Sequence, residues 1–262
     1  MHNIDIVSST AGGILTLEFN RLERKNAITS VMYQTLADAI NAAEQDSAVR
    51  AILIAGKAEI FTAGNDLDDF LKTAKPADGA AFGDRPVFNF MRALSGSSKP
   101  VVAAVSGAAI GIGTTLLMHC DLVYAADSAK FSMPFTQLGL CPEFGSSYLL
   151  QQIAGHARAA EKLMLGEAFT AQEAYDMGIV SKVLPAADVL AHAQAQAAKL
   201  VALPAASIRT TKRLMKAARI EPVQKAIEVE SKLFGEMLLA PEAKEAFTAF
   251  FEKRKPDFTK FS

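Results

Sequence analysis

The sequence has few cysteines, no excess of charge of either sign and no long hydrophobic run. Its 262 residues include two cysteines, Cys120 and Cys141, and neither lies in the repeated Cys or His spacing of metal sites. Lys and Arg number 27 against 28 Asp and Glu, a balance that does not favour nucleic acid or a membrane surface as partner. The apolar stretches are far too short to span a bilayer. We therefore expect a protein that binds no metal, no nucleic acid and no membrane.

Targeting signals are missing as well. The first residues, MHNIDIVSST, contain no positive region followed by an apolar run, and they lack the arginine-rich character of a transit peptide. The last three, KFS, do not match the peroxisomal signal SKL. With so few cysteines, a reducing compartment is favoured. These features predict a cytoplasmic protein.

The common nucleotide and hydrolase motifs are also lacking. The Gly-Ile-Gly at 111–113 is followed by Thr-Thr-Leu, so the third glycine of a dinucleotide fingerprint is missing. Neither a phosphate-binding P-loop nor a G-x-S-x-G nucleophile elbow occurs. The four histidines have no ligand spacing, and His119 lies in an apolar run where a core position is expected.

The first half of the sequence alternates strand and helix patterns. Residues 3–9 and 14–19 read as a hairpin joined at Gly12 and Gly13. Apolar residues at helical spacing predict a helix over 30–45. Runs at 51–55, 101–105 and 122–125 are bounded by Gly, Pro, Asp or Lys and are too short for a buried helix, so we expect buried strands. This alternation predicts an α/β core over residues 1–185.

After residue 145 the pattern becomes helical. Thr170 and Glu173 form a capping box, and a short strand is expected within 179–184. Helices are expected at 186–202, 205–219 and 222–238. A last helix begins at Pro241, with an expected buried face of Ala243, Ala246, Phe247, Phe250 and Phe251. Residues 186–262 are thus predicted to form a helical C-terminal region.

Two glycine-rich turns stand out, FTAGNDL at 61–67 and SGAAIGIG at 106–113. Each leads from a predicted buried strand towards a helix, where backbone N–H groups at the helix start have no intrahelical acceptor. Glycine lets the chain turn sharply and lets a ligand approach the backbone. A single turn of this kind is most often only a connection. Two of them, about 45 residues apart, predict a shared ligand site.

Around these turns the sequence resembles the enoyl-CoA hydratase/isomerase, or crotonase, superfamily. The segment NRLERKNAI at 20–28 is similar to the family's N-x-x-x-x-N-A-[LI] segment. The resemblance continues through 61–67, PVVAAVSG at 100–107, CDLVYA at 120–125 and FEKRKPDF at 251–258, and so covers nearly the whole chain. It implies a crotonase (ClpP/crotonase-like) spiral of ββα units. It also implies a homotrimer or a dimer of trimers, with residues 186–262 serving trimerisation and covering the active site.

The resemblance also implies an oxyanion hole for an acyl thioester. Its two donors would be the backbone N–H groups of Asn65 and Ile112, which stabilise the negative oxygen of an enolate without reorganising. Coenzyme A would enter as part of the substrate, with no separate cofactor. Its expected contacts are Arg24, Lys25, Ala63, Gly64, Asp66, Leu67, Gly111 and Lys253. Asp66 has an equal alternative as a helix cap, and the three basic residues have an alternative as solvated surface charges. Residues 72–86 are expected to form a loop that closes over the acyl chain.

The identity of the base decides the reaction. Family hydratases hold a water between two glutamates, whose positions fall here on Thr115 and Phe135, and this argues against a two-glutamate hydratase. Glu143, in GLCPEFGSSY at 139–148, is similar to the proton-carrying glutamate of the peroxisomal-type Δ3,Δ2-enoyl-CoA isomerases. Its apolar neighbours Cys141 and Phe144 are expected to raise its pKa.

The resulting prediction is an acyl-CoA enzyme of fatty-acid or related degradation that converts 3-enoyl-CoA to 2-enoyl-CoA through a dienolate. Three alternatives stay open. Glu143 could be a loop or helix-start acid favoured by the helix dipole. The protein could be an enoyl-CoA hydratase that uses Glu143 with another water-positioning partner. It could also be a catalytically silent acyl-CoA-binding scaffold.

Overall fold

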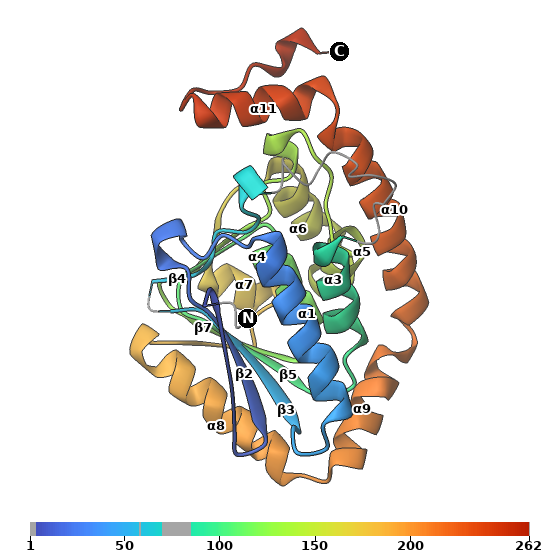
Figure 1. The fold of residues 1–262 in the computed structure, drawn as a ribbon. Helices are drawn as coiled ribbons and strands as arrows, with labels where there is room; N and C mark the ends of the chain where they lie inside the picture. The colour runs from blue at the N-terminus through green and yellow to red at the C-terminus, as the bar shows by residue number, and fades with distance from the viewer. Residues whose placement is uncertain (1–3, 58, 70–84, 262) are drawn as a thin grey trace.

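The computed structural model describes residues 4–57, 59–69 and 85–261 (Figure 1). Residues 72–84 of the expected acyl-chain loop lie outside this part, and Pro86 at its end begins a helix. Within the described residues no helix is long and apolar enough to cross a membrane. The same residues contain no group of three or more side chains placed to hold a metal ion.

A six-stranded sheet forms the base of the molecule, in the order β1-β2-β3-β5-β7-β10. Its strands are β1 (Ile6–Ala11), β2 (Ile14–Phe19), β3 (Ala51–Ala55), β5 (Val101–Val105), β7 (Leu122–Ala126) and β10 (Lys182–Leu184). The first two form the expected antiparallel hairpin, and every later neighbour pairs in parallel. β3 and β5 are buried along their whole length, as their uninterrupted apolar sequences predict for strands covered on both faces.

Helices cover both faces of this sheet. α1 (Ser30–Gln45) and α3 (Pro86–Gly96) pack against each other on one side, and α8 (Val189–Ala202) packs against β3, β5 and β7 on the other (Figure 1). The Thr29 hydroxyl accepts from the Met32 N–H and caps α1, so this helix begins where the apolar spacing predicted.

A second, four-stranded sheet is the feature that the sequence did not predict. It comprises β4 (Ile60–Thr62), β6 (Ala108–Ile110), β8 (Lys130–Ser132) and β9 (Phe169–Thr170), in that order. Each of the first three strands directly follows a strand of the large sheet, which produces repeated ββα units. Gly64 and Gly111 therefore follow β4 and β6, and these short strands connect the glycines to the predicted strands at 51–55 and 101–105. Strands of two or three residues are too short to show periodicity.

The helical second half agrees with the sequence prediction to within three residues at each boundary, apart from short turns. It contains α5 (Ser146–Ala154), α6 (His156–Ala160), α7 (Ala171–Met177), α9 (Ala205–Ala217), α10 (Ile220–Leu238) and α11 (Pro241–Phe251). Shorter helical turns are Leu22–Arg24, α4 (Ile112–Thr115), Leu116–His119, Thr136–Leu138, Glu161–Leu165, Ala186–Asp188 and Phe258–Lys260. The capping box at Thr170 and Glu173 is confirmed.

The last helix differs from the expectation in one respect. Ala243, Ala246 and Phe247 are buried, but Phe250 and Phe251 are 58% and 50% exposed. The start of α11 lies against the rest of the chain, since a Cβ on Gly139 would stand 2.7 Å from the backbone nitrogen of Ala243. Its other end projects beyond the body of the protein (Figure 1). The prediction that both phenylalanines are buried is therefore wrong for the single chain.

Candidate active site

The two glycine turns lie directly against each other. β4 and β6 pair in parallel, so the turns that follow them leave the small sheet at the same edge. A Cβ on Gly64, which has φ +85°, would stand 2.7 Å from the carbonyl oxygen of Ile110 and 3.9 Å from Cα of Gly111. Gly111 has φ +57° and ψ −120°, a conformation that side chains disfavour. Both glycines are thus required by the backbone conformation, and the first also by the close approach.

The two predicted oxyanion donors are available at this contact. The neighbouring amides of Asp66 and Gly111 donate to backbone carbonyls. No hydrogen bond within the described part of the chain uses the N–H of Asn65 or of Ile112. Ile112 is the first residue of α4, where an amide has no acceptor within its own helix. These two groups can therefore donate to the oxygen of a bound ligand.

A tyrosine that the sequence analysis missed fixes the side chain of Asn65. The hydroxyl of Tyr33, on the buried face of α1, donates to Oδ1 of Asn65 over 2.5 Å. Burial raises the pKa of Tyr33 well above its usual value, and the charge of Glu143 raises it further. Tyr33 therefore keeps its proton and stays a donor. Its sole signal in the sequence is its place on the apolar face of a helix.

Glu143 is a buried carboxylate with an unpaired oxygen. It lies in the loop before α5, it is 6% exposed, and within the described residues its Oε1 has no hydrogen-bond partner. Burial raises the pKa of Glu143 to about 8, the charge of Glu230 adds to the rise, and the nearby hydroxyl of Thr115 acts in the opposite direction. The predicted rise is confirmed. A carboxylate in this state is a stronger base than an ordinary glutamate.

Thr115 and Phe135 occupy the positions where family hydratases carry glutamates, and both are buried. Thr115 ends α4, only three residues after Ile112, so its interaction with Glu143 places that carboxylate beside the oxyanion turn. Phe135 packs edge-on against Phe234 of α10, with ring centroids 6.4 Å apart. Neither position supplies a second carboxylate that could hold a water.

The residue after Glu143 adopts an unusual backbone conformation. Phe144 has φ +58°, and its carbonyl accepts a hydrogen bond from Nε2 of His119 over 2.8 Å. The two rings stack 3.9 Å apart. Burial lowers the pKa of His119 to about 3, so the imidazole is neutral and its single ring proton lies on Nε2. The expected core position of His119 is confirmed, and this side chain also supports the base loop.

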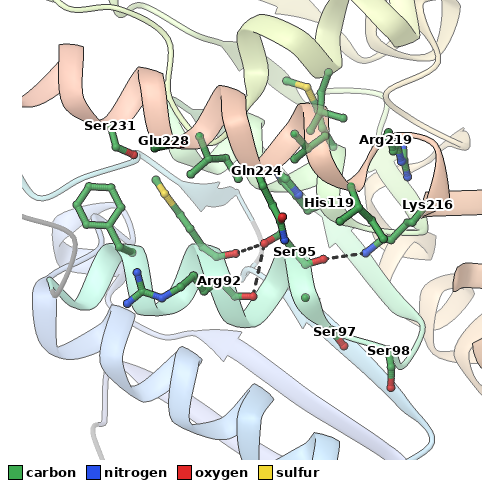
Figure 2. A pocket seen from close by; sticks show the side chains of 18 of the residues that line it. Arg92, Ser95, Ser97, Ser98, His119, Lys216, Arg219, Gln224, Glu228 and Ser231 are labelled. Atoms are coloured by element: carbon green, nitrogen blue, oxygen red, sulfur yellow. Dashed lines mark hydrogen bonds between the residues drawn. The ribbon is translucent and has the colours of Figure 1, made fainter.

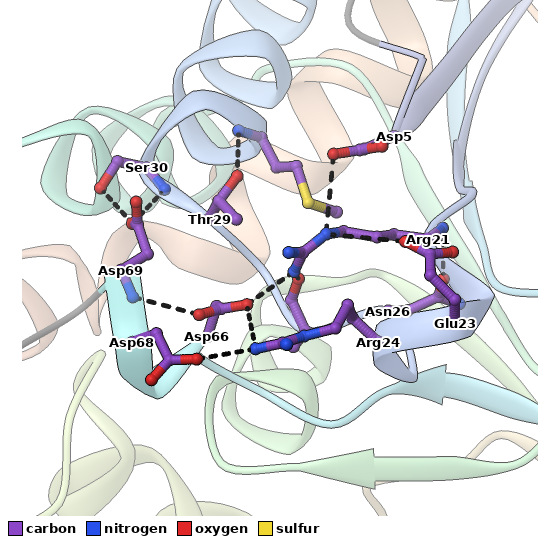
Figure 3. A network of polar contacts seen from close by, with 12 residues as sticks. Asp5, Arg21, Glu23, Arg24, Asn26, Thr29, Ser30, Asp66, Asp68 and Asp69 are labelled. Carbon is purple, nitrogen blue, oxygen red and sulfur yellow. Dashed lines mark hydrogen bonds and ion pairs between the residues drawn. The ribbon is translucent and has the colours of Figure 1, made fainter.

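Asp66 belongs to an ionic network beside the first turn (Figure 3). Its carboxylate accepts from Nη1 of Arg21 at 2.7 Å and from the Asp69 N–H at 3.1 Å, which caps the helical turn that starts at residue 67. Burial alone would raise the pKa of Asp66. The hydrogen bonds from Arg21 and from the Asp69 N–H, together with the charges of Arg21 and Arg24, outweigh burial and lower the pKa. The capping alternative for Asp66 is confirmed. Arg21 was not predicted, although it is part of the segment at 20–28.

Among the other expected coenzyme A contacts, one basic side chain is already in ion pairs and two are exposed at the surface. Nη2 of Arg24 lies 2.9 Å from Asp68 and 3.5 Å from Asp66, so its charge is already paired. Lys25 is exposed, and its carbonyl accepts from the N–H of Ala63 in the first turn. Lys253 is exposed in the turn after α11, and within the described residues no hydrogen bond or ion pair joins it to either glycine turn. A role of these residues in binding coenzyme A stays a prediction, as it does for Leu67.

A large hollow in the described part of the chain lies away from these groups. It has a volume of about 1460 Å³ and is enclosed by α3, α9 and α10 (Figure 2). Basic side chains including Arg209, Arg213 and Arg219 line it, but Asn65, Ile112 and Glu143 do not. His119 stands on its wall and separates it from Phe144. The oxyanion donors and the base therefore lie outside this hollow.

Comparison with known proteins identifies the family. A family model described as enoyl-CoA hydratase/isomerase matches residues 9–260. The probable enoyl-CoA hydratase of Bacillus subtilis is 33% identical over 234 residues, which cover 89% of this chain and 90% of that protein. Enoyl-CoA delta isomerase 2 of Rattus norvegicus is 35% identical over 252 residues, 96% of this chain and 64% of that protein.

The structural comparison agrees with the sequence matches. The crystal structure of an enoyl-CoA hydratase/isomerase from Pseudoalteromonas atlantica superposes with a TM-score of 0.92 at 38% identity, over 97% of this chain and 100% of that one. The expected crotonase spiral with a helical C-terminal region is therefore confirmed. The relatives are named as hydratases and as isomerases, so their names do not distinguish the two reactions. The chain belongs to the enoyl-CoA hydratase/isomerase family.

Proposed function

We propose that this protein is an enoyl-CoA isomerase that converts 3-enoyl-CoA thioesters to conjugated 2-enoyl-CoA thioesters during acyl-CoA degradation. The observation that carries the proposal is the buried carboxylate of Glu143, whose Oε1 has no hydrogen-bond partner among the described residues, beside a threonine that stands where a hydratase carries its first glutamate. One carboxylate suffices to move a proton between two carbons. Hydration by the family's two-glutamate arrangement requires a second one.

The reaction would begin when the thioester oxygen accepts hydrogen bonds from the backbone N–H groups of Asn65 and Ile112. The ionised carboxylate of Glu143 removes a proton from C2, and the electron pair of that C–H bond delocalises over the thioester and the C3–C4 double bond. The two amides stabilise the negative oxygen of this dienolate. Glu143 then returns the proton to C4, which leaves the double bond between C2 and C3. Atoms and charges balance without any additional reactant.

The raised pKa of Glu143 suits both halves of this cycle. The protein holds the pKa at about 8, so the carboxylate is a strong enough base to accept the proton and a good enough acid to return it. The carboxylate is buried, and this limits loss of the proton to water during the transfer. Tyr33 holds Asn65 by its side chain and thereby steadies the peptide that supplies the first oxyanion donor.

Coenzyme A is proposed to run along the first turn. Ala63, Gly64 and Leu67 would contact it mainly through the backbone, and Lys25 has an exposed ammonium group for a phosphate. Arg24 would have to release or share Asp68 in order to do the same. Lys253 would reach the ligand only from the turn after α11, either in its own subunit or in a neighbouring one.

Residues 186–262 are proposed to form subunit contacts in a homotrimer or a dimer of trimers. Large apolar side chains are exposed on these helices, among them Leu214, Met215 and Leu239 together with Phe250 and Phe251. Apolar surface of this kind commonly marks a protein interface. Light scattering coupled to gel filtration tests this: a monomer at micromolar concentration would contradict it.

Parallel assays with trans-3-enoyl-CoA and trans-2-enoyl-CoA test the reaction. Formation of the conjugated product from the first substrate, without hydration of the second and with loss of turnover in Glu143→Gln, is the expected result. Hydration of the second substrate in place of isomerisation would indicate a hydratase. Binding of both thioesters without turnover of either would indicate a silent acyl-CoA scaffold.

A further inference from the structure

Glu230, on α10, is a second buried carboxylate close to the base. It is 5% exposed and accepts from three donors, all in Gly145 and Ser147, which follow closely after Glu143. Its Oε2 accepts from the Gly145 N–H at 2.5 Å, and its Oε1 accepts from the Ser147 N–H at 2.9 Å and from the Ser147 hydroxyl. Burial of a carboxylate costs free energy, and these hydrogen bonds compensate for that cost.

These donors lie at the start of α5. Gly145 is the residue before the helix, and no side chain of its own segment caps that end. Glu230 supplies the cap from another helix, where its negative charge also interacts favourably with the helix dipole. The Ser146 N–H in turn donates to the carbonyl of Glu143 at 3.1 Å. The cap therefore fixes the backbone immediately after the base.

α10 packs tightly against this loop. A Cβ on Gly145 would stand 3.3 Å from Cγ1 of Ile227 and 3.4 Å from Cγ1 of Val223, which lie on the same face of α10 as Glu230. On the other side of the base, the thiol of Cys141 lies 3.7 Å from the carbonyl of Glu230. Contacts with α10 thus hold the loop both before and after Glu143.

The loop needs such support because its conformation is strained. Phe144 has φ +58°, which for a bulky residue persists only when its surroundings enforce it. His119 holds the carbonyl of Phe144 from one side, and Glu230 holds Gly145 and Ser147 from the other. Glu143 itself has no hydrogen bond at Oε1 within the described residues, so its direction depends on this backbone.

The charge of Glu230 also acts on the base. Three titratable groups interact with Glu143 from the elements around it: Glu230 on α10, Tyr33 on α1 and Cys141 in the same loop. Burial raises the pKa of Cys141 to about 11 and that of Tyr33 well above its usual value, so both stay neutral near pH 7. Burial raises the pKa of Glu230 as well, but its hydrogen bonds from Ser147 and Gly145 favour the ionised form. Among these three groups, the charge of Glu230 is the one that opposes ionisation of Glu143.

We propose that Glu230 is the positioning residue of the base: its carboxylate, carried by a C-terminal helix, fixes the loop at 143–147 and thereby aims the Glu143 carboxylate at the oxyanion turns. This inference rests on the proposed function only in taking Glu143 as the proton carrier. It assigns α10 a part in catalysis besides its part in packing.

Two substitutions separate geometry from charge. Glu230→Gln keeps the shape but removes the charge and turns an N–H₂ group towards one of the donors. Ser147→Ala keeps the charge and removes one donor. Glu228→Gln is the matched control on the same helix, because Glu228 is exposed and pairs only with Lys225 among the described residues.

We expect kcat for 3-enoyl-CoA to fall about ten-fold or more in Glu230→Gln and about three-fold or more in Ser147→Ala, with KM nearly unchanged. In Glu230→Gln the acidic limb of the pH profile of kcat moves to lower pH, and in Ser147→Ala it stays in place. Glu228→Gln behaves as wild type. A purely structural cap would lower the urea midpoint without changing kcat in the folded fraction.

A titration of the glutamate carboxyl groups by ¹³C NMR gives a readout that needs no turnover, with Glu143 assigned through Glu143→Gln. The Glu143 signal is expected to titrate at lower pH in Glu230→Gln than in wild type. If the wild type fails to isomerise 3-enoyl-CoA, the proposed function fails while this titration still judges Glu230. Unchanged kcat in folded Ser147→Ala, or an unchanged Glu143 titration in folded Glu230→Gln, would overturn the proposal.

Discussion

Replacing Gly64 with alanine should impair catalysis far more than it impairs folding. Gly64 has φ +85°, and the new Cβ would stand 2.7 Å from the carbonyl oxygen of Ile110. Real Cβ atoms stay about 3.0 Å or more from such an atom, so one or both turns must shift by several tenths of an ångström. The peptide that carries the Asn65 N–H is the first to move. The distance between the two oxyanion donors changes with it.

The expected magnitude follows from two separate contributions. Alanine at positive φ costs on the order of 1 kcal/mol of stability. Loss of one oxyanion donor typically lowers kcat about 10² to 10³-fold, or about 3–4 kcal/mol of transition-state stabilisation. We therefore expect a modest fall in the free energy of unfolding and a fall in kcat of about two orders of magnitude, because the ground-state carbonyl depends on these donors less than the dienolate does.

Gly178→Ala is the matched control. Gly178 has φ +87° at the end of α7, and the nearest atom to a new Cβ is a side-chain carbon of Ile153 at 3.4 Å, an ordinary contact. It should show the same cost in stability without the loss in kcat. Steady-state kinetics with 3-enoyl-CoA and urea unfolding of both variants provide the comparison. A folded Gly64→Ala enzyme with kcat within about two-fold of wild type would refute the oxyanion role of these turns.

Three further substitutions test the base, the ionic network beside the first turn and the proposed coenzyme A contact. Glu143→Gln should lower kcat by about 10² to 10⁴-fold with little change in binding of the thioester, measured by calorimetry. The folded pKa of Glu143 is about 8, above its ordinary 4.5, so the native state binds this proton more tightly and stability falls as pH rises between those values. Glu143→Gln should hence be more stable than wild type at pH 8, by a few kcal/mol at most, and no more stable below about pH 4.5; equal urea midpoints at both pH values would contradict the pKa. Arg21→Gln leaves Asp66 buried without its main partner and should cost about 1–3 kcal/mol in urea unfolding at pH 7, less as the pH falls and Asp66 is protonated. Lys25→Gln should weaken coenzyme A binding several-fold at low salt and hardly at high salt, with kcat unchanged; a salt-independent effect would exclude a phosphate contact.

The sequence predicted those parts of the site whose residue types have few substitutes. Gly64 and Gly111 have positive φ, and no other residue serves there at low cost, so the glycines mark the turns in the sequence. Glu143 was identified through the resemblance of the segment at 139–148 to the isomerases, because its own surroundings in the sequence also fit a loop acid. Long elements such as α1 and β3 show their periodicity or their apolar runs, and their boundaries agree with the prediction.

The remaining parts depend on contacts between distant segments. Glu230 and Tyr33 reach the site from helices whose patterns only indicate burial, and neither is distinguishable in sequence from an ordinary helix residue. The strand β4 exists because it pairs with β6, and three residues carry no periodic signal of their own. Phe250 and Phe251 were expected in the core because an apolar stripe does not reveal whether its cover comes from the same chain.

Transfer of a hydrogen label tests the central claim most directly. The enzyme would convert 3-enoyl-CoA that carries deuterium at C2 in ordinary water, and mass spectrometry with NMR would locate the label in the product. If Glu143 alone moves one proton from C2 to C4, the product carries deuterium at C4 in a substantial fraction of molecules, and the reaction is lost in Glu143→Gln. Product with only solvent hydrogen at C4, formed equally well by Glu143→Gln, would contradict the account.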